Sequence, residues 1–225
     1  MEARFRADYP GEFVVVNSVW SAGKHAQQRE WIANPIENQH ISGRAVCIGS
    51  RESKQDSFPW GIDYTILQRH RGGLLGTLKL QTYGVGIIAE EMRLDFTVEL
   101  EPTQLSKLVE NKYYENNVVY TTAKNCINNP GDFYLIPLNP KLLLPALPIY
   151  LAAFDGHQEI FLIGYSQEND FGNDRWVTDI KSVFDAYVGV KFWLVGEATN
   201  MPGVWYDSPN VRAMPYRDFI GYADV

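Results

Sequence analysis

Short apolar runs recur along the chain, each bounded by turn residues, and several are apolar at nearly every position. "IFLIGY" and "KFWLVG" show this pattern most plainly. Strands that are covered on both faces carry such runs, as in a parallel sheet flanked by helices. The pattern predicts strands at Phe13–Val19, Arg44–Ser50, Tyr64–His70, Arg93–Leu100, Asn117–Thr122, Asp132–Pro137, Glu159–Tyr165, Lys191–Glu197 and Val211–Pro215.

Helical periodicity lies between some of these strands. In "RWVTDIKSVFDAYVG", Arg175–Gly189, apolar residues recur at the spacing of one helical face, and Asn173 or Asp174 can cap the start. Further helices are predicted at Pro148–Phe154, Thr103–Asn111 and Tyr216–Ala223. From Asn117 onward strands and helices alternate, which implies right-handed crossovers. The predicted fold class is therefore α/β, with a single doubly wound, mostly parallel sheet and flanking helices, a Rossmann-like arrangement.

No linker divides the sequence, so we expect a single α/β domain over residues 1–225. The segment Gly72–Met92, "GGLLGTLKLQTYGVGIIAEEM", has the least regular pattern. We interpret it as an insertion with few helical signals, either a hairpin or a lid-like loop.

The composition is that of a globular protein, with 45% hydrophobic and 21% charged residues. The longest apolar stretch, Leu142–Phe154, is too short to span a bilayer, and the N-terminal residues lack the apolar core of a secretory signal. Cys47 and Cys126 show no CxxC spacing, which predicts free thiols, a cytoplasmic location and no zinc site. No membrane partner is expected.

The net charge of −7 argues against a general nucleic-acid binder, because phosphate contacts need clustered Lys and Arg. Residues 1–80 hold ten Lys and Arg against eight Asp and Glu, whereas residues 81–225 hold ten against nineteen. "LQRHRGG" is the compact basic cluster of the sequence. An anionic small molecule is the partner that such a cluster attracts.

The common nucleotide and hydrolase motifs are absent from the sequence. It has no GxxxxGK[ST], GxGxxG, HExxH or GxSxG, and "GVGIIA" meets only a looser GxGxxA form without a clear strand, turn and helix around it. This argues against ATPases, ordinary dehydrogenases, zinc hydrolases and serine hydrolases. No cofactor and no metal site is predicted.

Four polar loops follow predicted strands. The carboxyl ends of parallel strands share one edge of the sheet, and ligands bind in the crevice there. The loops are Gly49–Asp56, His70–Gly73, Thr121–Asn125 and Ser166–Asp174.

The first loop combines backbone access with hydrogen-bonding groups. Gly49 allows close approach of a ligand to the backbone, Ser50 and Ser53 offer hydroxyls, and Arg51 offers a planar fork that suits phosphate or carboxylate. The alternative is a solvated turn in which these residues bind nothing.

The second loop places Arg69, His70 and Arg71 before two glycines. Histidine titrates near neutrality, so His70 is a candidate general base, and the arginines are candidates for a phosphate clamp. The alternative is a charged strand end without a ligand.

The third and fourth loops offer further candidates. Thr122 and Lys124 suit a sugar or phosphate, although such residues equally often cap a following turn. Glu168 and Asp170 suit sugar hydroxyls, general-base chemistry by Asp170 or a divalent ion, and a solvated acidic loop is the alternative.

"RAVCIGSRES", followed much later by "PALPIYLAAFDGHQEIFLIGYSQEND", resembles the Rossmann-type core of sialyltransferase-like glycosyltransferases. The resemblance implies that the loop after the first strand meets a nucleotide, and that a helix containing Leu151, Ala152 and Ala153 leads through Gly156 into the next strand. The loop here has Ser-Arg-Glu-Ser where that group often has a Gly-Pro-Ser turn. "QREWIANPI" is similar to uncharacterised proteins of large contractile-tailed phages.

Two functions are therefore weighed. The first is a glycosyltransferase-like enzyme that binds a nucleotide-activated sugar at the carboxyl edge of the sheet, with His70 or Asp170 as its base. The alternative is a non-catalytic phage protein, a virion component or a binder of host nucleotide or protein, located in the host cytoplasm. Thirteen tyrosines and six tryptophans supply aromatic surface for a protein partner.

Overall fold

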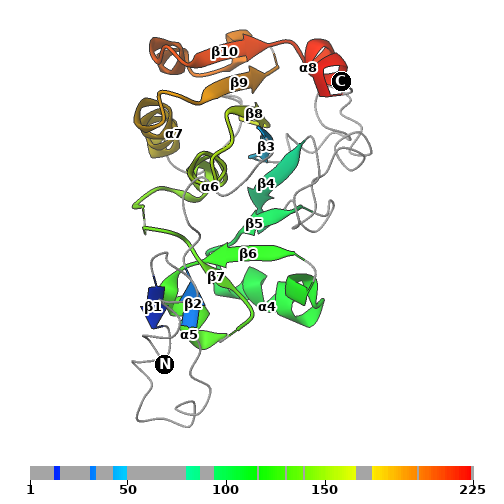
Figure 1. Cartoon of the computed structure of the whole chain (residues 1–225), viewed down its shortest axis with the longest axis vertical. Coiled ribbons are helices and arrows are strands. Elements are labelled where there is room, and N and C mark those ends of the chain that lie inside the picture. Colours follow the sequence, from blue (N-terminus) through cyan, green and yellow to red (C-terminus); the bar gives the residue numbers. More distant parts are fainter. Residues whose placement is uncertain are drawn as a thin grey trace.

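The computed structural model of the chain describes residues 13–15, 31–33, 43–49, 80–86, 94–115, 117–129, 131–138, 140–165, 174–196 and 198–223. In this part of the chain eight parallel strands form one sheet, in the order β10-β9-β8-β3-β4-β5-β6-β7 (Figure 1). A separate antiparallel pair joins two short strands, β1 (Phe13–Val15) and β2 (Trp31–Ala33). The fold class predicted from the apolar runs is confirmed.

From residue 117 onward the elements follow the predicted alternation, except that an additional helix lies between the strands predicted at Asn117–Thr122 and Asp132–Pro137. The strands are β3 (Arg44–Ile48), β4 (Gln81–Val85), β5 (Phe96–Val98), β6 (Val118–Thr121), β7 (Tyr134–Leu135), β8 (Glu159–Ile163), β9 (Lys191–Val195) and β10 (Val211–Met214). The α-helices are α4 (Pro102–Glu110), α5 (Ala123–Asn128), α6 (Leu147–Phe154), α7 (Arg175–Ala186) and α8 (Tyr216–Ala223), with short 3-10 turns η2 (Tyr113–Glu115), η3 (Leu144–Ala146), η4 (Ala198–Asn200) and η5 (Gly203–Asp207).

Helices cover both faces of the sheet. Ala45 and Cys47 of β3 pack in the same core as α6 and α7, whereas Val46 and Ile48 pack with α8 on the opposite face. Farther along the sheet, Val119 of β6 packs against α4 and α5. Because successive side chains of β3 enter different cores, the strand is apolar at consecutive positions, and this is why its sequence shows no alternation.

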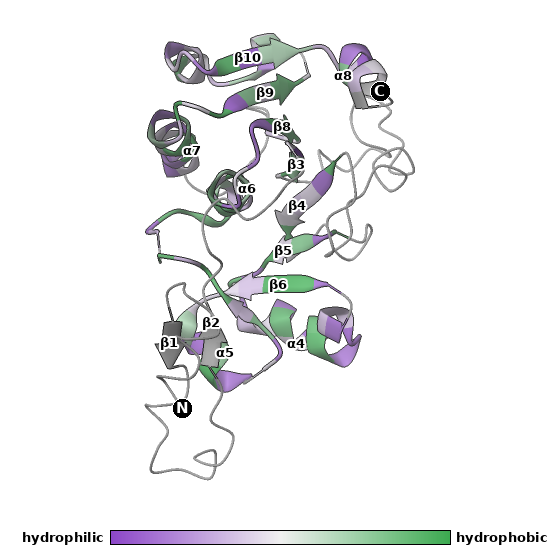
Figure 2. Cartoon of the chain, in the orientation of Figure 1, coloured by the Kyte–Doolittle hydropathy of each residue, from purple (hydrophilic) through white to green (hydrophobic). Residues whose placement is uncertain are grey.

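Helix α6 is the centre of the larger core. All eight of its residues are buried, since it lies between the sheet and α7. In Figure 2, α7 carries both hydrophilic and hydrophobic residues, in agreement with one exposed and one buried face. The side of the sheet under α6 also holds an aromatic stack, in which the rings of Tyr83 and Phe96 lie 4.5 Å apart.

One central strand was not predicted from the sequence. Gln81–Val85 is β4, which pairs with β3 and β5, although the sequence analysis placed an insertion over Gly72–Met92. The strand contains two buried polar residues: Thr82 Oγ1 donates to Asp95 Oδ2 at 2.9 Å, whereas neither polar side-chain atom of Gln81 has a hydrogen-bond partner among the described residues. Apart from Leu80 and Gly86, which flank the strand, the rest of the segment lies outside the described residues, where a lid-like loop stays a prediction, as does the single-domain organisation.

Helix α5 was also missed, because its residues were interpreted as a polar loop. The predicted strand Tyr64–His70 lies outside the described residues. Cys47 and Cys126 are both buried and unpaired.

Candidate functional site

The order of the strands reverses between β3 and β8. From β3 the chain moves outward through β4, β5, β6 and β7, then returns through η3 and α6 to β8 on the other side of β3 (Figure 1). The connections that leave these two neighbouring strands therefore diverge at their carboxyl ends. In open α/β sheets this divergence creates the crevice in which ligands bind. The carboxyl edge at β3 and β8 is the candidate site.

Gly49 lies at this edge, in close contact with the chain after β8. Its N–H donates to the carbonyl oxygen of Ile163 at 3.0 Å. A β-carbon at position 49 would stand 2.6 Å from Cε1 of Tyr165, so no larger residue fits unless the ring moves. Tyr165 is fully buried, and burial raises the pKa of its phenol well above the usual range. The sequence predicted Gly49 for its access to a ligand, and the structure adds packing against Tyr165 as a second reason.

A buried carboxylate that the sequence analysis missed lies farther along the same edge. Glu99 follows β5 directly and is 3% exposed. Its Oε1 accepts hydrogen bonds from the N–H groups of Leu100 and Glu101, each at 2.8 Å. Desolvation raises the pKa of this carboxyl above its ordinary value, although the two backbone hydrogen bonds oppose the shift.

The residues predicted to form a polar loop after β6 are the start of helix α5. Thr122 is the N-cap of α5, and its side chain accepts a hydrogen bond from the N–H of Asn125. Asn125 Nδ2 in turn donates to the carbonyl oxygen of Leu100 and to Thr121 Oγ1, both at 2.9 Å. Lys124 is exposed in the first turn of α5. The structure thus gives Thr122 the capping role that was the alternative to ligand binding.

Three strand spacings, roughly 14 Å, separate the carboxyl ends of β3 and β6. Gly49 and Thr122 therefore share the edge without being neighbours. The other candidates lie outside the described residues, and their roles stay predictions: Ser50, Arg51, Ser53, Arg69, His70, Arg71, Glu168 and Asp170. Ser50 is the residue after Gly49, so the segment that contains the first three of them begins at the candidate site.

A second buried polar group lies under the end of α6, away from the carboxyl edge. The hydroxyl of Tyr83 donates to Asp155 Oδ2 at 2.6 Å and lies 3.0 Å from His157 Nε2. Because the phenol gives its proton to Asp155, His157 Nε2 must donate to the phenol oxygen, a tautomer that we infer from the network. Burial raises the pKa of Asp155 to about 7. We assign this group to holding α6 on the sheet.

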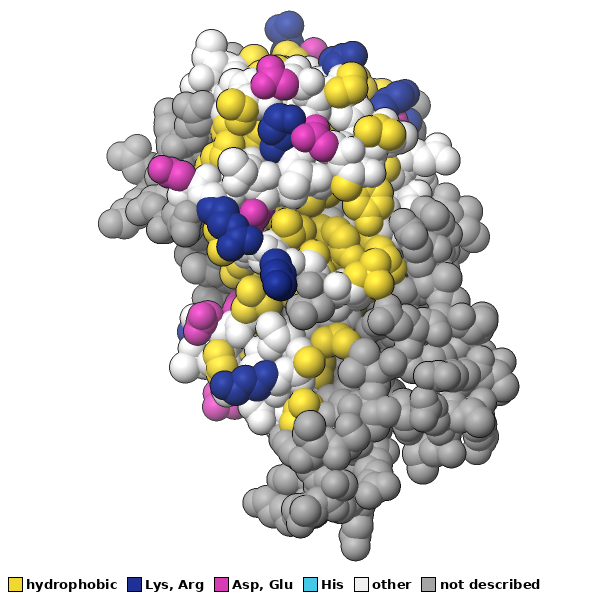
Figure 3. All heavy atoms as spheres, turned by 90° about the vertical axis from the view of Figure 1, so that its left-hand side faces the viewer, with side chains coloured by type: hydrophobic (Ala, Val, Ile, Leu, Met, Phe, Trp, Pro, Cys, Tyr) yellow, Lys and Arg dark blue, Asp and Glu magenta, His cyan; other side chains and the backbone are white. Residues whose placement is uncertain are grey.

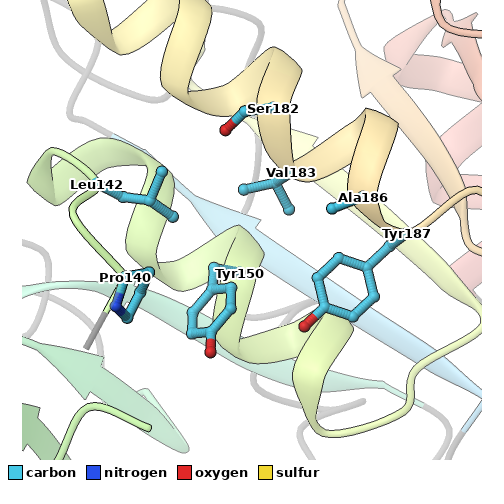
Figure 4. Close-up of a pocket in the computed structure, with 7 residues that line it drawn as sticks. All are labelled: Pro140, Leu142, Tyr150, Ser182, Val183, Ala186 and Tyr187. Atoms are coloured by element: carbon cyan, nitrogen blue, oxygen red, sulfur yellow. The ribbon is translucent and has the colours of Figure 1, made fainter. Parts of the chain in front are cut away.

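A shallow apolar groove lies between α6 and α7 on the outside of the molecule. It has a volume of about 470 Å³ and is lined by Pro140, Leu142, Tyr150, Ser182, Val183, Ala186 and Tyr187 (Figure 4). Figure 3 looks onto the side of the molecule on which α6 and α7 lie, where hydrophobic side chains gather at the surface. The hydroxyl of Tyr150 is already engaged, since it donates to the carbonyl oxygen of Pro137 at 3.0 Å. The groove therefore offers apolar surface and few free polar groups.

Within the described ranges, no group of three or more His, Cys, Asp and Glu side chains is arranged to hold a metal ion. Nor does any helix among them have the length and apolarity needed to cross a membrane.

No family model and no curated protein matches the chain. Among solved structures it is similar to the sialyltransferase CstII from Campylobacter jejuni in complex with cytidine-5′-monophosphate, at 15% identity and a TM-score of 0.41, over 67% of this chain and 78% of that one. A variant of the same enzyme in complex with CMP gives 11% identity and a TM-score of 0.42, over 67% and 80%. These are distant likenesses in fold. The comparisons do not support the resemblance to phage proteins.

Proposed function

We propose that the chain is a glycosyltransferase-like protein that binds a nucleotide-activated sugar at the carboxyl edge of its sheet, beside β3 and β8. The reversal of strand order between these two strands is the observation that carries the proposal. It creates the crevice in which doubly wound sheets bind their ligands, whatever chemistry they support.

The choice of an anionic nucleotide ligand depends on the chemistry of the segment that begins there. Arg51 follows Gly49 by two residues, and its guanidinium can form two charge-assisted hydrogen bonds to one phosphate. The sugar conjugate as donor rests on the sequence resemblance to sialyltransferase-like enzymes. In glycosyl transfer a base removes the proton of the acceptor hydroxyl as it attacks the sugar, and the nucleotide leaves; His70 and Asp170 are the candidates for this base.

The proposal is tested by ligand-induced thermal stabilisation. The panel consists of nucleoside mono- and diphosphates and nucleotide sugars, with cytidine nucleotides included because the similar structures contain CMP. A ligand that binds the native state raises the melting temperature by mass action. We expect at least one nucleotide to do so, and an unchanged melting temperature with the whole panel would contradict the proposal.

Calorimetric titration of the best ligand then tests the loop. Arg51→Ala should weaken binding about ten- to a hundredfold, the loss of a hydrogen bond to a charged group. Lys191→Ala is the matched control, because it removes the same charge from the amino end of β9, at the opposite edge of the sheet. Equal affinities of the two variants for the ligand would show that Arg51 does not contact it.

A further inference from the structure

Glu99 is one of three residues that lie just beyond the carboxyl ends of neighbouring strands. Gly49 follows β3, Gly86 follows β4 and Glu99 follows β5. The pairing of β4 with β5 ends at Val85 and Val98, and the N–H of Glu99 continues the pairing with β6 by donating to the carbonyl oxygen of Tyr120 at 3.1 Å. Gly86 and Glu99 are thus the next positions on β4 and β5. Both lie at the same edge as Gly49.

The two carboxylate oxygens of Glu99 have different surroundings. Oε1 accepts both backbone hydrogen bonds, whereas among the described residues none is formed to Oε2. A β-carbon on Gly86 would stand 2.0 Å from Oε2. Oε2 therefore occupies the space that a side chain on β4 would fill, and it points along the edge toward β4 and β3.

A purely structural role of Glu99 explains the hydrogen bonds to Oε1 but not the position of Oε2. Bonding two N–H groups at the start of α4 needs one acceptor oxygen, which the amide of a glutamine also provides. Burial of a carboxylate is unfavourable unless it is paired, and no ion pair of Glu99 is found in the described part of the chain. A hydrogen-bond donor from a ligand would satisfy the remaining oxygen.

We propose that Glu99 Oε2 accepts a hydrogen bond from a ribose hydroxyl of the bound nucleotide. This inference rests on the proposed function. Glu99 then recognises the ribose of the nucleotide. It follows β5, whereas the loops predicted from the sequence follow other strands.

Both the negative charge and the position of Glu99 favour a hydroxyl, and not a phosphate, as the ligand group that it binds. A carboxylate repels phosphate, so the phosphate must bind elsewhere on the edge. The carboxyl ends of β3 and β5 are two strand spacings apart, about 10 Å, which a 5′-phosphate and a ribose hydroxyl can bridge with a hydrogen bond at each end. A phosphate beside Gly49 and a ribose beside Glu99 therefore fit one nucleotide lying across β4, where the Glu99 carboxylate lies in the place of a side chain on Gly86.

The test combines a protein change with a ligand change. Glu99→Gln retains an oxygen for the N–H groups of Leu100 and Glu101 but can place an amide nitrogen, which cannot accept, at the position of Oε2. Glu101→Gln is the matched control, since it makes the same change two residues away on an exposed side chain. The ligands are a ribonucleoside monophosphate that binds the native protein and its 2′,3′-dideoxy counterpart, each titrated by calorimetry.

We expect Glu99→Gln to weaken binding of the ribonucleotide about ten- to a hundredfold, and to leave binding of the dideoxynucleotide unchanged. Glu101→Gln should alter neither. If Glu99→Gln weakens both ligands equally, or neither, the nucleotide site stands but Glu99 does not contact the ribose. If no ribonucleotide binds the native protein, the proposed function and this inference both fail. Equal melting temperatures of the two variants without ligand show that folding is not the cause.

Discussion

At the scale of single residues, glycines at the carboxyl edge are required by neighbours that are distant in sequence. Gly49 leaves room for the ring of Tyr165, and Gly86 leaves room for the carboxylate of Glu99. The sequence showed that Gly49 ends a strand, but it could not show which side chain lies over it. Glu99 was missed because the strand predicted at Arg93–Leu100 included it, whereas the observed strand ends at Val98.

Gly49→Ala should reduce the free energy of unfolding by about 1–3 kcal/mol, because the added methyl group overlaps the ring of Tyr165. Gly43→Ala is the control at the other end of β3, where an added β-carbon has no neighbour within 4 Å. Urea denaturation of both variants measures the difference. In a Tyr165→Ala background the cost of Gly49→Ala should disappear, and a cost that persists there would show that the ring is not its cause.

Asp155 makes a specific contribution to the pH dependence of stability. Its pKa is raised from 3.8 to about 7 in the folded state, so between these values the native state binds more protons than the unfolded state. Stability from this group is therefore present below about pH 4 and lost as the pH rises to 7. Asp155→Asn should remove this loss, which is on the order of 4 kcal/mol, while its amide oxygen still accepts from Tyr83.

Urea denaturation of the wild type and Asp155→Asn between pH 4.5 and 7.5 measures the effect. The difference in unfolding free energy between the two proteins should change steadily in favour of the variant across this range. The contributions of groups that lie far from Asp155 are common to both proteins. Parallel pH profiles would show that Asp155 keeps an ordinary pKa.

At the scale of elements, apolar periodicity predicted the helices and strands whose own residues make the core. The predicted helix Tyr216–Ala223 has the bounds of α8, and the strands at Glu159–Tyr165 and Lys191–Glu197 are β8 and β9. It failed at β4, where Gln81 and Thr82 are polar yet buried. Thr82 is hydrogen-bonded to Asp95, which lies just before β5, and a local pattern does not contain such a partner.

Helix α6 should contribute more to stability than any exposed segment of its length. Leu151→Ala should lower the free energy of unfolding by about 2–5 kcal/mol, because the side chain is fully buried between the sheet and α7. Leu138→Ala is the matched control, since Leu138 is 64% exposed, and its effect should stay within about 0.5 kcal/mol. Similar losses in the two variants, measured by urea denaturation, would show that α6 is not part of the core.

At the scale of the whole molecule, the sheet and its point of reversal define the candidate site. The sequence predicted a parallel sheet and its ligand-binding edge, because buried parallel strands and the polar residues after them are local features. It could not predict the strand order, which depends on how the chain returns from β7 to β8. That order decides which loops share a crevice, and so it separates Gly49 from Thr122 while bringing Gly49 and Tyr165 together.

The central claim, nucleotide binding at the carboxyl edge beside β3 and β8, is tested most directly by mapping amide chemical shifts during titration with the nucleotide that stabilises the protein most. Resonances of Gly49, Gly86 and Tyr165 should shift with ligand concentration. Those of Gly43 and Gln158 should not, because these residues are hydrogen-bonded to each other at the opposite edge of the same two strands. Shifts centred on Gly43 and Gln158, or no shifts with any nucleotide, would contradict the account.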